Sequence, residues 1–342
     1  MSQRKAAKRA PDPAGTPAAL EADWAARVRA NREQAERVSE VKAGDFYAPV
    51  SSLFVADPRR TGEPALDRLF EQAGSNETWL DIGAGAGRYA LPLALRVREV
   101  IAVEPSPSMR RALRTGMGEH GIGNIRVVPA AWPAGLDELG ELPAADVALI
   151  AHVGYDIEEI GPFLDALEAA TRRRGVAILT DRSPASVADP FWPLVHDEAR
   201  VPLPALSELL ALLLARGREP VVTVAQRSPR SFESVEALTA FLRRQLFIAE
   251  GGEKDVHFRA ILPDHISRRD GAWTLTDPPQ GSLGIVTWPV RAASTSGSPR
   301  SVSVSGFLKG FAHLVPWPTN TASSSGSAWR ADRSRRTGRL SG

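Results

Sequence analysis

The stretch Trp79-Leu80-Asp81-Ile82-Gly83-Ala84-Gly85-Ala86-Gly87-Arg88-Tyr89 decides the fold of this chain. Its first residues are typical of a buried strand, and its glycines suit a tight turn, because glycine adopts backbone angles that other residues avoid and lets a ligand approach the main chain. The residues that follow predict a helix, whose N-terminus offers unpaired N–H groups to an anionic group of a ligand. The segment therefore predicts a strand, a glycine turn and a helix that together bind a ligand.

The next predicted strand ends in Val103-Glu104-Pro105. An acidic side chain at this place can accept hydrogen bonds from both hydroxyls of a ribose, which indicates a nucleoside ligand. The dinucleotide fingerprint requires the spacing G-x-G-x-x-G, but position 88 is arginine and the third glycine comes one residue early. The spacing argues against a nicotinamide oxidoreductase, which we keep as an alternative.

The spacing Asp-x-Gly-x-Gly-x-Gly resembles the first motif of class I S-adenosylmethionine-dependent methyltransferases. The resemblance extends over about residues 65–290 and implies an enzyme that uses S-adenosylmethionine as its cofactor. It implies that the glycine loop lies beside the amino-acid portion of the cofactor and that the acid after the second strand holds the ribose. The cofactor-binding residues that we carry over are Asp81, Gly83, Ala84, Gly85, Gly87, Glu104 and Pro105.

One departure from the family pattern follows the third predicted strand. Many relatives carry an acid there that contacts the adenine amino group, whereas this chain reads Pro129-Ala130-Ala131-Trp132. We include Trp132 among the cofactor-binding residues as a side chain that stacks on the adenine. The alternative is a tryptophan that packs beneath the loop.

Short apolar runs alternate with helical patterns along the chain, as in a parallel sheet that is buried on both faces. We predict an α/β fold: a Rossmann-like, seven-stranded, mostly parallel and doubly wound sheet, with a helical cap inserted between the last two strands. The predicted strands are 78–82, 100–103, 125–128, 147–151, 176–180, 221–225 and 284–290. The predicted helices are 20–42, 88–96, 107–114, a short one near Asp137, 157–173, 205–216 and 235–248.

The domain boundaries follow from composition. We expect a disordered basic tail at 1–17, an N-terminal helix and lid segment at 18–64, and a methyltransferase domain at 65–290. Within that domain, residues 227–283 are expected to form a cap over the substrate, since a structureless loop of this length is rare in a compact domain. Residues 291–342 are rich in Ser, Gly and Arg and predict a second disordered basic tail.

The net charge of +2 conceals an asymmetry. Residues 1–17 contribute +3 and residues 291–342 contribute +7, so residues 18–290 carry −8. An acidic body repels a phosphate backbone, and we therefore do not expect nucleic acid as the substrate.

The chain contains no cysteine, which excludes disulfides and thiolate catalysis and fits a reducing compartment. No apolar run reaches the roughly 20 residues needed to span a bilayer, and no apolar segment follows the basic N-terminal residues as in a secretory signal. We expect a cytoplasmic protein with no membrane partner, and the sequence leaves its oligomeric state open.

Methyl transfer needs proximity and orientation more than a catalytic group, because the cofactor brings an activated electrophile. The catalytic candidates are His152 and Tyr155, which follow the fourth predicted strand at the functional edge of the sheet. His152 binds or deprotonates an acceptor, or else hydrogen-bonds the neighbouring loop. Phe46 and Tyr47 close over the cofactor or pack in the core.

The remaining histidines suggest no metal site. His196 lies in Trp192-Pro193-Leu194-Val195-His196, a segment that can form a substrate wall or simply pack. His257 and His265 lie in the inserted region without metal-ligand spacing, so we predict no metal.

We predict transfer of a methyl group to a small-molecule acceptor by in-line displacement. His152-Val153-Gly154-Tyr155 stands where enzymes that methylate amino groups of DNA bases carry Asn-Pro-Pro-Tyr or Asp-Pro-Pro-Tyr. Two alternatives remain: an RNA methyltransferase recruited through the basic tails, and a non-catalytic protein that only binds the nucleoside cofactor.

Overall fold

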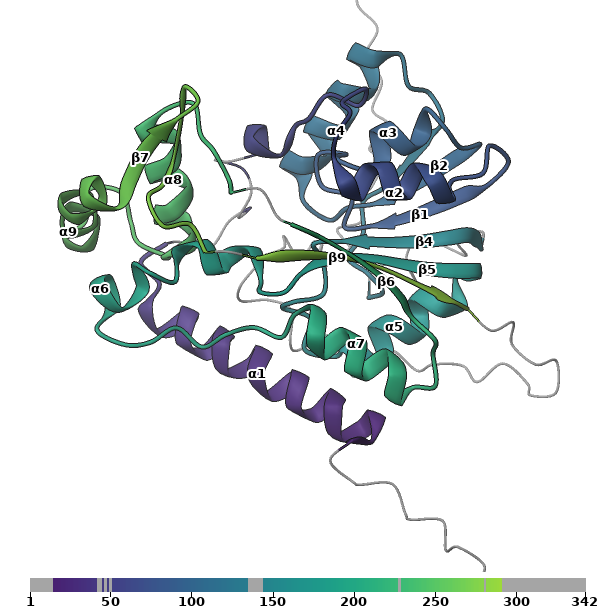
Figure 1. The fold of residues 1–342 in the computed structure, drawn as a ribbon, viewed down its shortest axis with the longest axis horizontal. Helices are drawn as coiled ribbons and strands as arrows, with labels where there is room; N and C mark the ends of the chain where they lie inside the picture. The colour runs from purple at the N-terminus through teal and green to yellow at the C-terminus, as the bar shows by residue number, and fades with distance from the viewer. Residues whose placement is uncertain are drawn as a thin grey trace, which may run out of the picture.

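A seven-stranded sheet runs through the centre of the protein, with helices on both of its faces (Figure 1). The computed structural model describes residues 15–41, 45, 48, 51–134, 144–226, 229–279 and 281–290. The predicted short helix near Asp137, the aromatic residues Phe46 and Tyr47, and the tail 291–342 lie outside these residues.

The strand order is β3-β2-β1-β4-β5-β9-β6. Every neighbouring pair is parallel except for the two that β9 makes, with β5 and with β6. The prediction of a Rossmann-like, mostly parallel sheet is therefore confirmed. The strands are β1 (Thr78–Ile82), β2 (Glu99–Val103), β3 (Ile125–Val128), β4 (Ala145–Ala151), β5 (Thr171–Thr180), β6 (Val221–Gln226) and β9 (Ser282–Pro289).

Two hydrophobic cores, one on each face, hold the helices to the sheet. Trp24, Phe163 and Leu209 belong to the first core, and Leu66, Leu91 and Leu113 belong to the second. Burial on both faces explains why the central strands are continuous apolar runs without alternation. The first core lies beneath α1 (Pro17–Val38), α5 (Ile160–Ala169) and α7 (Leu206–Ala215), and the second beneath α2 (Pro64–Gln72), α3 (Ala90–Ala94) and α4 (Pro107–His120).

The insertion between β6 and β9 builds a third core beyond the carboxyl ends of the parallel strands (Figure 1, green). Its side chains pack against the segment that follows β5, so that Phe258 meets Phe191 edge to face at 5.4 Å between ring centres. The segment after β5 holds the 3₁₀-helix η4 (Pro184–Ala188) and α6 (Trp192–His196). The insertion holds α8 (Val235–Gln245), α9 (Glu253–Ile261), η5 (Leu262–His265) and the antiparallel strands β7 (Ile266–Arg269) and β8 (Ala272–Leu275). The prediction of a helical cap is therefore incomplete, because the insertion also contains this β-hairpin.

Several helix boundaries differ from the prediction. The helix predicted at 157–173 ends at Ala169, and residues 171–173 begin β5, where Arg173 and Arg174 donate to Glu77. The helix predicted at 88–96 is only α3, because the glycine turn extends to Tyr89. The first helix starts at Pro17, inside the tail predicted at 1–17, since the Thr16 hydroxyl accepts a capping hydrogen bond from Ala19 N (3.3 Å).

None of the helices in the described ranges is both long enough and apolar enough to cross a membrane.

Candidate functional site

The glycine loop connects β1 to α3 in a left-handed backbone conformation at three positions. Gly83, Gly85 and Gly87 have φ of 74°, 57° and 87°, a region that is costly for residues with a side chain. The loop is fixed to the next strand, because Gly83 N and Ala84 N both donate to Val103 O, at 2.8 and 3.2 Å. The predicted turn is confirmed, and its position at the carboxyl end of β1 follows from this pairing.

The three glycines differ in what surrounds them. A Cβ on Gly83 would lie 2.5 Å from Val153 Cγ2, and one on Gly87 would lie 2.5 Å from Leu113 Cδ1. A Cβ on Gly85 would meet no atom within 4 Å. Gly83 and Gly87 therefore allow close packing within the protein, whereas Gly85 faces open space where a ligand can approach the backbone.

Glu104 links the second strand to the glycine loop. Its Oε2 accepts a hydrogen bond from Gly85 N (2.8 Å) and its Oε1 accepts one from Ser106 N (2.7 Å). Burial raises the pKa of the Glu104 carboxyl, against the lowering effect of these two N–H groups and of the Arg110 guanidinium. Arg110 also donates to the carbonyl oxygens of Glu104 and Pro105, which fixes the chain as it enters α4.

Asp81 is a second buried acid beside the loop. Its side chain is 2% exposed and makes no hydrogen bond with any other residue in the described part of the chain. Burial, and after it the neighbouring Glu104 carboxylate, raises the pKa of Asp81 to about 7. An unpaired buried carboxylate favours a cationic group of a ligand as its partner.

A third acid reaches this region from the N-terminal segment. Asp45 Oδ2 accepts hydrogen bonds from Ser106 Oγ (2.9 Å) and Ser108 N (3.0 Å) at the first turn of α4. This contact could not be predicted, because Asp45 lies 61 positions from Ser106 and belongs to no helix or strand pattern. Ser106 itself could have been recognised, since a serine before a proline is a common helix start.

The end of the glycine loop is held by a small ionic cluster. Glu63 Oε2 accepts hydrogen bonds from Arg60 Nε (2.7 Å) and Arg88 Nη2 (2.9 Å), and Tyr89 OH donates to Glu63 Oε1 (3.1 Å). Arg60 also donates to the carbonyl oxygen of Arg88. Residues 60–63 thus fasten the loop from the side of the N-terminal segment.

Trp132 packs into the protein interior. It is 5% exposed and its Nε1 donates to Phe163 O of α5 at 3.3 Å. The indole is a member of the core beneath α5. This placement favours the packing role of Trp132 over stacking on the adenine.

His152 and Tyr155 lie where β4 and β5 end, as expected. His152 has φ of 57°, and its N–H donates to Ile178 O (2.8 Å), which continues the pairing of the two strands. Tyr155 is 5% exposed; its hydroxyl accepts from Thr180 N (2.8 Å) and lies 2.9 Å from Thr180 Oγ1. Thr180 Oγ1 in turn donates to Arg182 O, so Tyr155 fixes the end of β5.

The other histidines lie apart from the glycine loop. His196 packs on the Trp192 ring at 4.6 Å and its Nε2 donates to Leu246 O (2.9 Å). His257 lies 3.0 Å from Leu194 O, and the ring of His265 meets Phe191 edge to face at 5.2 Å. All three join the insertion to the segment after β5.

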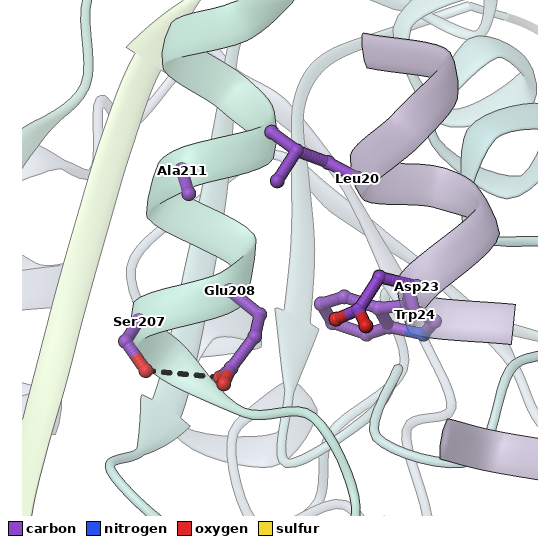
Figure 2. Close-up of a pocket in the computed structure, with 6 residues that line it drawn as sticks. All are labelled: Leu20, Asp23, Trp24, Ser207, Glu208 and Ala211. Carbon is purple, nitrogen blue, oxygen red and sulfur yellow. Dashed lines mark hydrogen bonds between the residues drawn. The ribbon is translucent and has the colours of Figure 1, made fainter. Parts of the chain in front are cut away.

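Two cavities flank α1. The larger, of about 230 Å³, lies between α1 and α7 and is lined by side chains of these two helices (Figure 2). The smaller, of about 110 Å³, lies between α1, the segment after β5 and the chain before α7. The smaller cavity includes Asp181, Arg182 and Ser183, which directly follow the carboxyl end of β5.

Comparison with known proteins agrees with this geometry. Residues 80–179, from β1 to β5, match the family described as "Methyltransferase domain". The prediction of a methyltransferase domain is therefore confirmed for residues 80–179.

Two groups of curated relatives match the domain in part. A probable cobalt-precorrin-6B C(15)-methyltransferase (decarboxylating) of Methanothermobacter thermautotrophicus is 27% identical over 113 residues, which are 31% of this chain and 57% of the relative. A tRNA/tmRNA (uracil-C(5))-methyltransferase of Pseudomonas putida is 31% identical over 83 residues, which are 24% of this chain and 23% of the relative. The chain therefore spans only part of the length of either curated relative.

Solved structures resemble the chain more loosely. An S-adenosylmethionine-dependent methyltransferase from Thiobacillus denitrificans in complex with S-adenosylhomocysteine has a TM-score of 0.45 and 14% identity, covering 72% of this chain and 98% of that one. The YcgJ protein of Bacillus subtilis has a TM-score of 0.45 and 17% identity, covering 67% and 99%.

Proposed function

We propose that this protein is an S-adenosylmethionine-dependent methyltransferase that transfers a methyl group to a small-molecule acceptor by in-line displacement. The observation that carries the proposal is the glycine loop itself. Gly85, which has open space before it, donates its N–H to the buried acid Glu104, and the unpaired carboxylate of Asp81 lies close by.

The residues present fit this cofactor. Its sulfonium and ammonium groups are cationic, and the described residues near the loop contribute the carboxyls of Asp81, Glu104 and Asp45. Glu104 keeps unused acceptor capacity after its two N–H bonds, since a carboxylate accepts about four. We assign the ribose hydroxyls to Glu104 and the cationic amino-acid portion to Asp81.

S-adenosylmethionine supplies, when bound, a methyl group on a positively charged sulfur. The chain contributes binding and orientation, which are worth several kcal/mol of the barrier by general estimates. The glycine backbone sets the cofactor against β1 and β4, and Tyr155 holds the end of β5 through Thr180. We place His152 beside the acceptor as a residue that orients it.

The test is calorimetric binding of S-adenosylmethionine, S-adenosylhomocysteine and NADH to wild type, Gly85→Val and Glu104→Ala. We expect micromolar binding of the two sulfur nucleosides, loss of that binding in both variants, and no binding of NADH. Glu119→Ala, at an exposed position of α4, is the matched control and should bind like wild type. A folded wild-type protein that binds neither sulfur nucleoside would refute the proposal.

RNA as the acceptor is a second candidate, since the printed names of the Pseudomonas relatives specify tRNA and tmRNA. The two basic tails are the parts of the chain suited to bind a phosphate backbone. A chain without residues 1–17 and 291–342 should keep its activity on a small acceptor. Loss of both RNA binding and methyl transfer on deletion would instead favour the RNA methyltransferase.

A further inference from the structure

We infer that the smaller cavity, at the carboxyl end of β5, binds the methyl acceptor, and that this acceptor is a small zwitterion with an amino group and a carboxylate. The inference rests on the proposed function and specifies its substrate class. It depends on the charges and hydroxyl groups that line the cavity.

The cavity lies on the same edge of the sheet as the glycine loop. It begins at Asp181, whose N–H donates to Ser282 O at 3.0 Å, directly after the last residue of β5. In the sheet order only β4 separates β5 from β1, which carries the loop. The bonds from Tyr155 to Thr180 and from Thr180 to Arg182 connect the candidate catalytic residue to the cavity wall.

The cavity wall carries an excess of positive charge around Asp189. Asp189 is shared by two guanidiniums, Arg182 at 2.6 Å and Arg200 at 3.6 Å. The Arg200 side chain is 8% exposed and lies 4.6 Å above the Trp192 ring, and it donates to Ala185 O. Two cations for one carboxylate leave a charge of +1, which suits a ligand carboxylate.

The wall also carries an unpaired acid. The Asp181 carboxylate makes no ion pair and no hydrogen bond with any other described residue. The remaining charged groups of the wall, Arg27 and Glu208, neutralise each other at 2.6 Å. The lining is therefore neutral in total but offers both a spare positive charge and an unpaired carboxylate, which a zwitterion complements.

Two serine hydroxyls add polar partners. Ser183 and Ser186 are each 8% exposed as whole residues and line the cavity, and neither hydroxyl bonds to another residue in the described ranges. Both hydroxyls are therefore available to hydrogen-bond a ligand in the cavity. The volume of about 110 Å³ corresponds to about four water molecules at roughly 30 Å³ each, which suits a small amino acid.

The reaction balances with these groups. The ligand ammonium gives one proton to the Asp181 carboxylate, and its nitrogen lone pair then forms the bond to the methyl carbon. The bond between carbon and sulfur breaks with its electron pair going to sulfur, which leaves the neutral thioether. Asp181 returns the proton to water.

The experiment measures binding of glycine, β-alanine and the common L-amino acids to the full chain by thermal shift and calorimetry, with and without S-adenosylhomocysteine. Ethylamine and propionate serve as the two half-ligands. We expect at least one amino acid to bind, and to bind more tightly than either half-ligand. Mass spectrometry with methyl-labelled S-adenosylmethionine should then detect its N-methyl derivative.

Three variants test whether the amino acid binds in the smaller cavity. Asp181→Asn should lower the affinity for the amino acid about tenfold or more, which is the loss expected for one charge-assisted bond. The affinity for S-adenosylmethionine should stay unchanged. Asp23→Asn, in the larger cavity of Figure 2, is the matched control and should change neither. Ser186→Ala gives a second, milder variant that should weaken the same ligand.

Three results would overturn the inference: no amino acid binds while S-adenosylmethionine does, Asp181→Asn binds the amino acid as well as wild type, or the half-ligands bind equally well. An amino acid that binds through Asp181 while no sulfur nucleoside binds would support the cavity and refute only the proposed function.

Discussion

Asp81 combines a buried carboxyl with no hydrogen-bonding partner among the described residues, so its ionisation opposes folding. The pKa of Asp81 is raised from 3.8 in the unfolded reference to about 7. Between these values the folded state holds a proton that the unfolded state has released, and the free energy of unfolding therefore falls as pH rises through this window. Above about pH 7 the Asp81 carboxylate is ionised in both states, and it lowers the free energy of unfolding by its full amount.

We predict that Asp81→Asn raises the melting temperature of the cofactor-free protein at pH 8, where the wild-type carboxylate is ionised. The gain should shrink toward pH 4, where the folded wild-type protein keeps the Asp81 carboxyl protonated and the cost of ionising it disappears. Thermal unfolding at a series of pH values measures this. Equal effects at both pH values would show that the asparagine acts through packing.

The same residue predicts how cofactor binding depends on pH. A cationic ligand stabilises the ionised form of Asp81, so S-adenosylmethionine should bind more weakly as pH falls below about 7. Calorimetry at pH 8 and pH 6 should show this loss in wild type and a flatter profile in Asp81→Asn. A wild-type affinity that does not change with pH would contradict the assignment of Asp81.

The glycines of the loop provide a matched pair of variants. Gly87→Ala places a Cβ 2.5 Å from Leu113 and 2.8 Å from Leu91, whereas Gly85→Ala enters open space. We predict that Gly87→Ala lowers the free energy of unfolding by about 2–4 kcal/mol, from the backbone strain together with the clash. Gly85→Ala should cost about 1–2 kcal/mol, the strain alone. Urea unfolding separates the two, and similar losses would show that the loop adjusts at position 87.

At the scale of elements, the beginning of β5 depends on one buried acid. Glu77 accepts hydrogen bonds from Arg173, Arg174, Trp79 Nε1 and Gly74 N. We predict that Glu77→Gln lowers the free energy of unfolding by about 3 kcal/mol, because it leaves the largely buried Arg174 guanidinium without its anion. Glu71→Gln, which breaks the exposed pair with Arg68, should cost under about 1 kcal/mol. Equal losses by chemical denaturation would contradict a special role for Glu77.

The strands of the central sheet were predictable, because parallel strands buried on both faces form continuous apolar runs. The start of β5 was not, because Arg172, Arg173 and Arg174 continue a helical pattern by composition. Arg172 pairs with Asp146, and Arg173 and Arg174 pair with Glu77, only in the tertiary structure. The hairpin of β7 and β8 has strands of four residues each, too short to show alternation. Its turn did carry a signal: Asp270-Gly271 has φ of 50° and 82°, as a tight hairpin turn requires.

The candidate site also contains some residues that the sequence predicts and others that it does not. The glycine loop and Glu104 follow from local spacing, so the sequence predicted them. Asp45 meets α4, and Asp181 lines one cavity with Arg27 and Arg200, only because distant segments converge. No local pattern encodes such convergence.

At the scale of the whole molecule, three distant segments meet at His196. Lys254 Nζ donates to His196 Nδ1 (3.4 Å) and lies 3.8 Å from Glu40, which follows α1 and accepts from Ala249 N (3.0 Å). Burial and, less strongly, Lys254 lower the pKa of His196 below 6.5, against the nearby Leu246 carbonyl, Glu198 and Glu40. As pH falls below about 6.5, the unfolded state takes up a proton at His196 before the folded state does. The stability that the neutral His196 contributes is therefore lost in this range.

We predict that α8 and α9 exchange their amide hydrogens faster, relative to the intrinsic rate, at pH 5.5 than at pH 7.5. The reason is that a protonated His196 repels Lys254 and cannot accept its hydrogen bond. Hydrogen exchange with mass spectrometry measures the change, and His196→Gln should reduce it. An effect of the same size at the central strands would show that the whole fold, and not the insertion, responds to pH.

The place at which the insertion joins the sheet has a consequence for protein engineering. The chain leaves the sheet at Gln226 and returns at Ser282, and these residues face each other in neighbouring antiparallel strands. A two-residue turn is enough to join such strands. Residues 227–281 can therefore be exchanged for a module from another protein without altering the register of any strand, which makes this junction a natural recombination point.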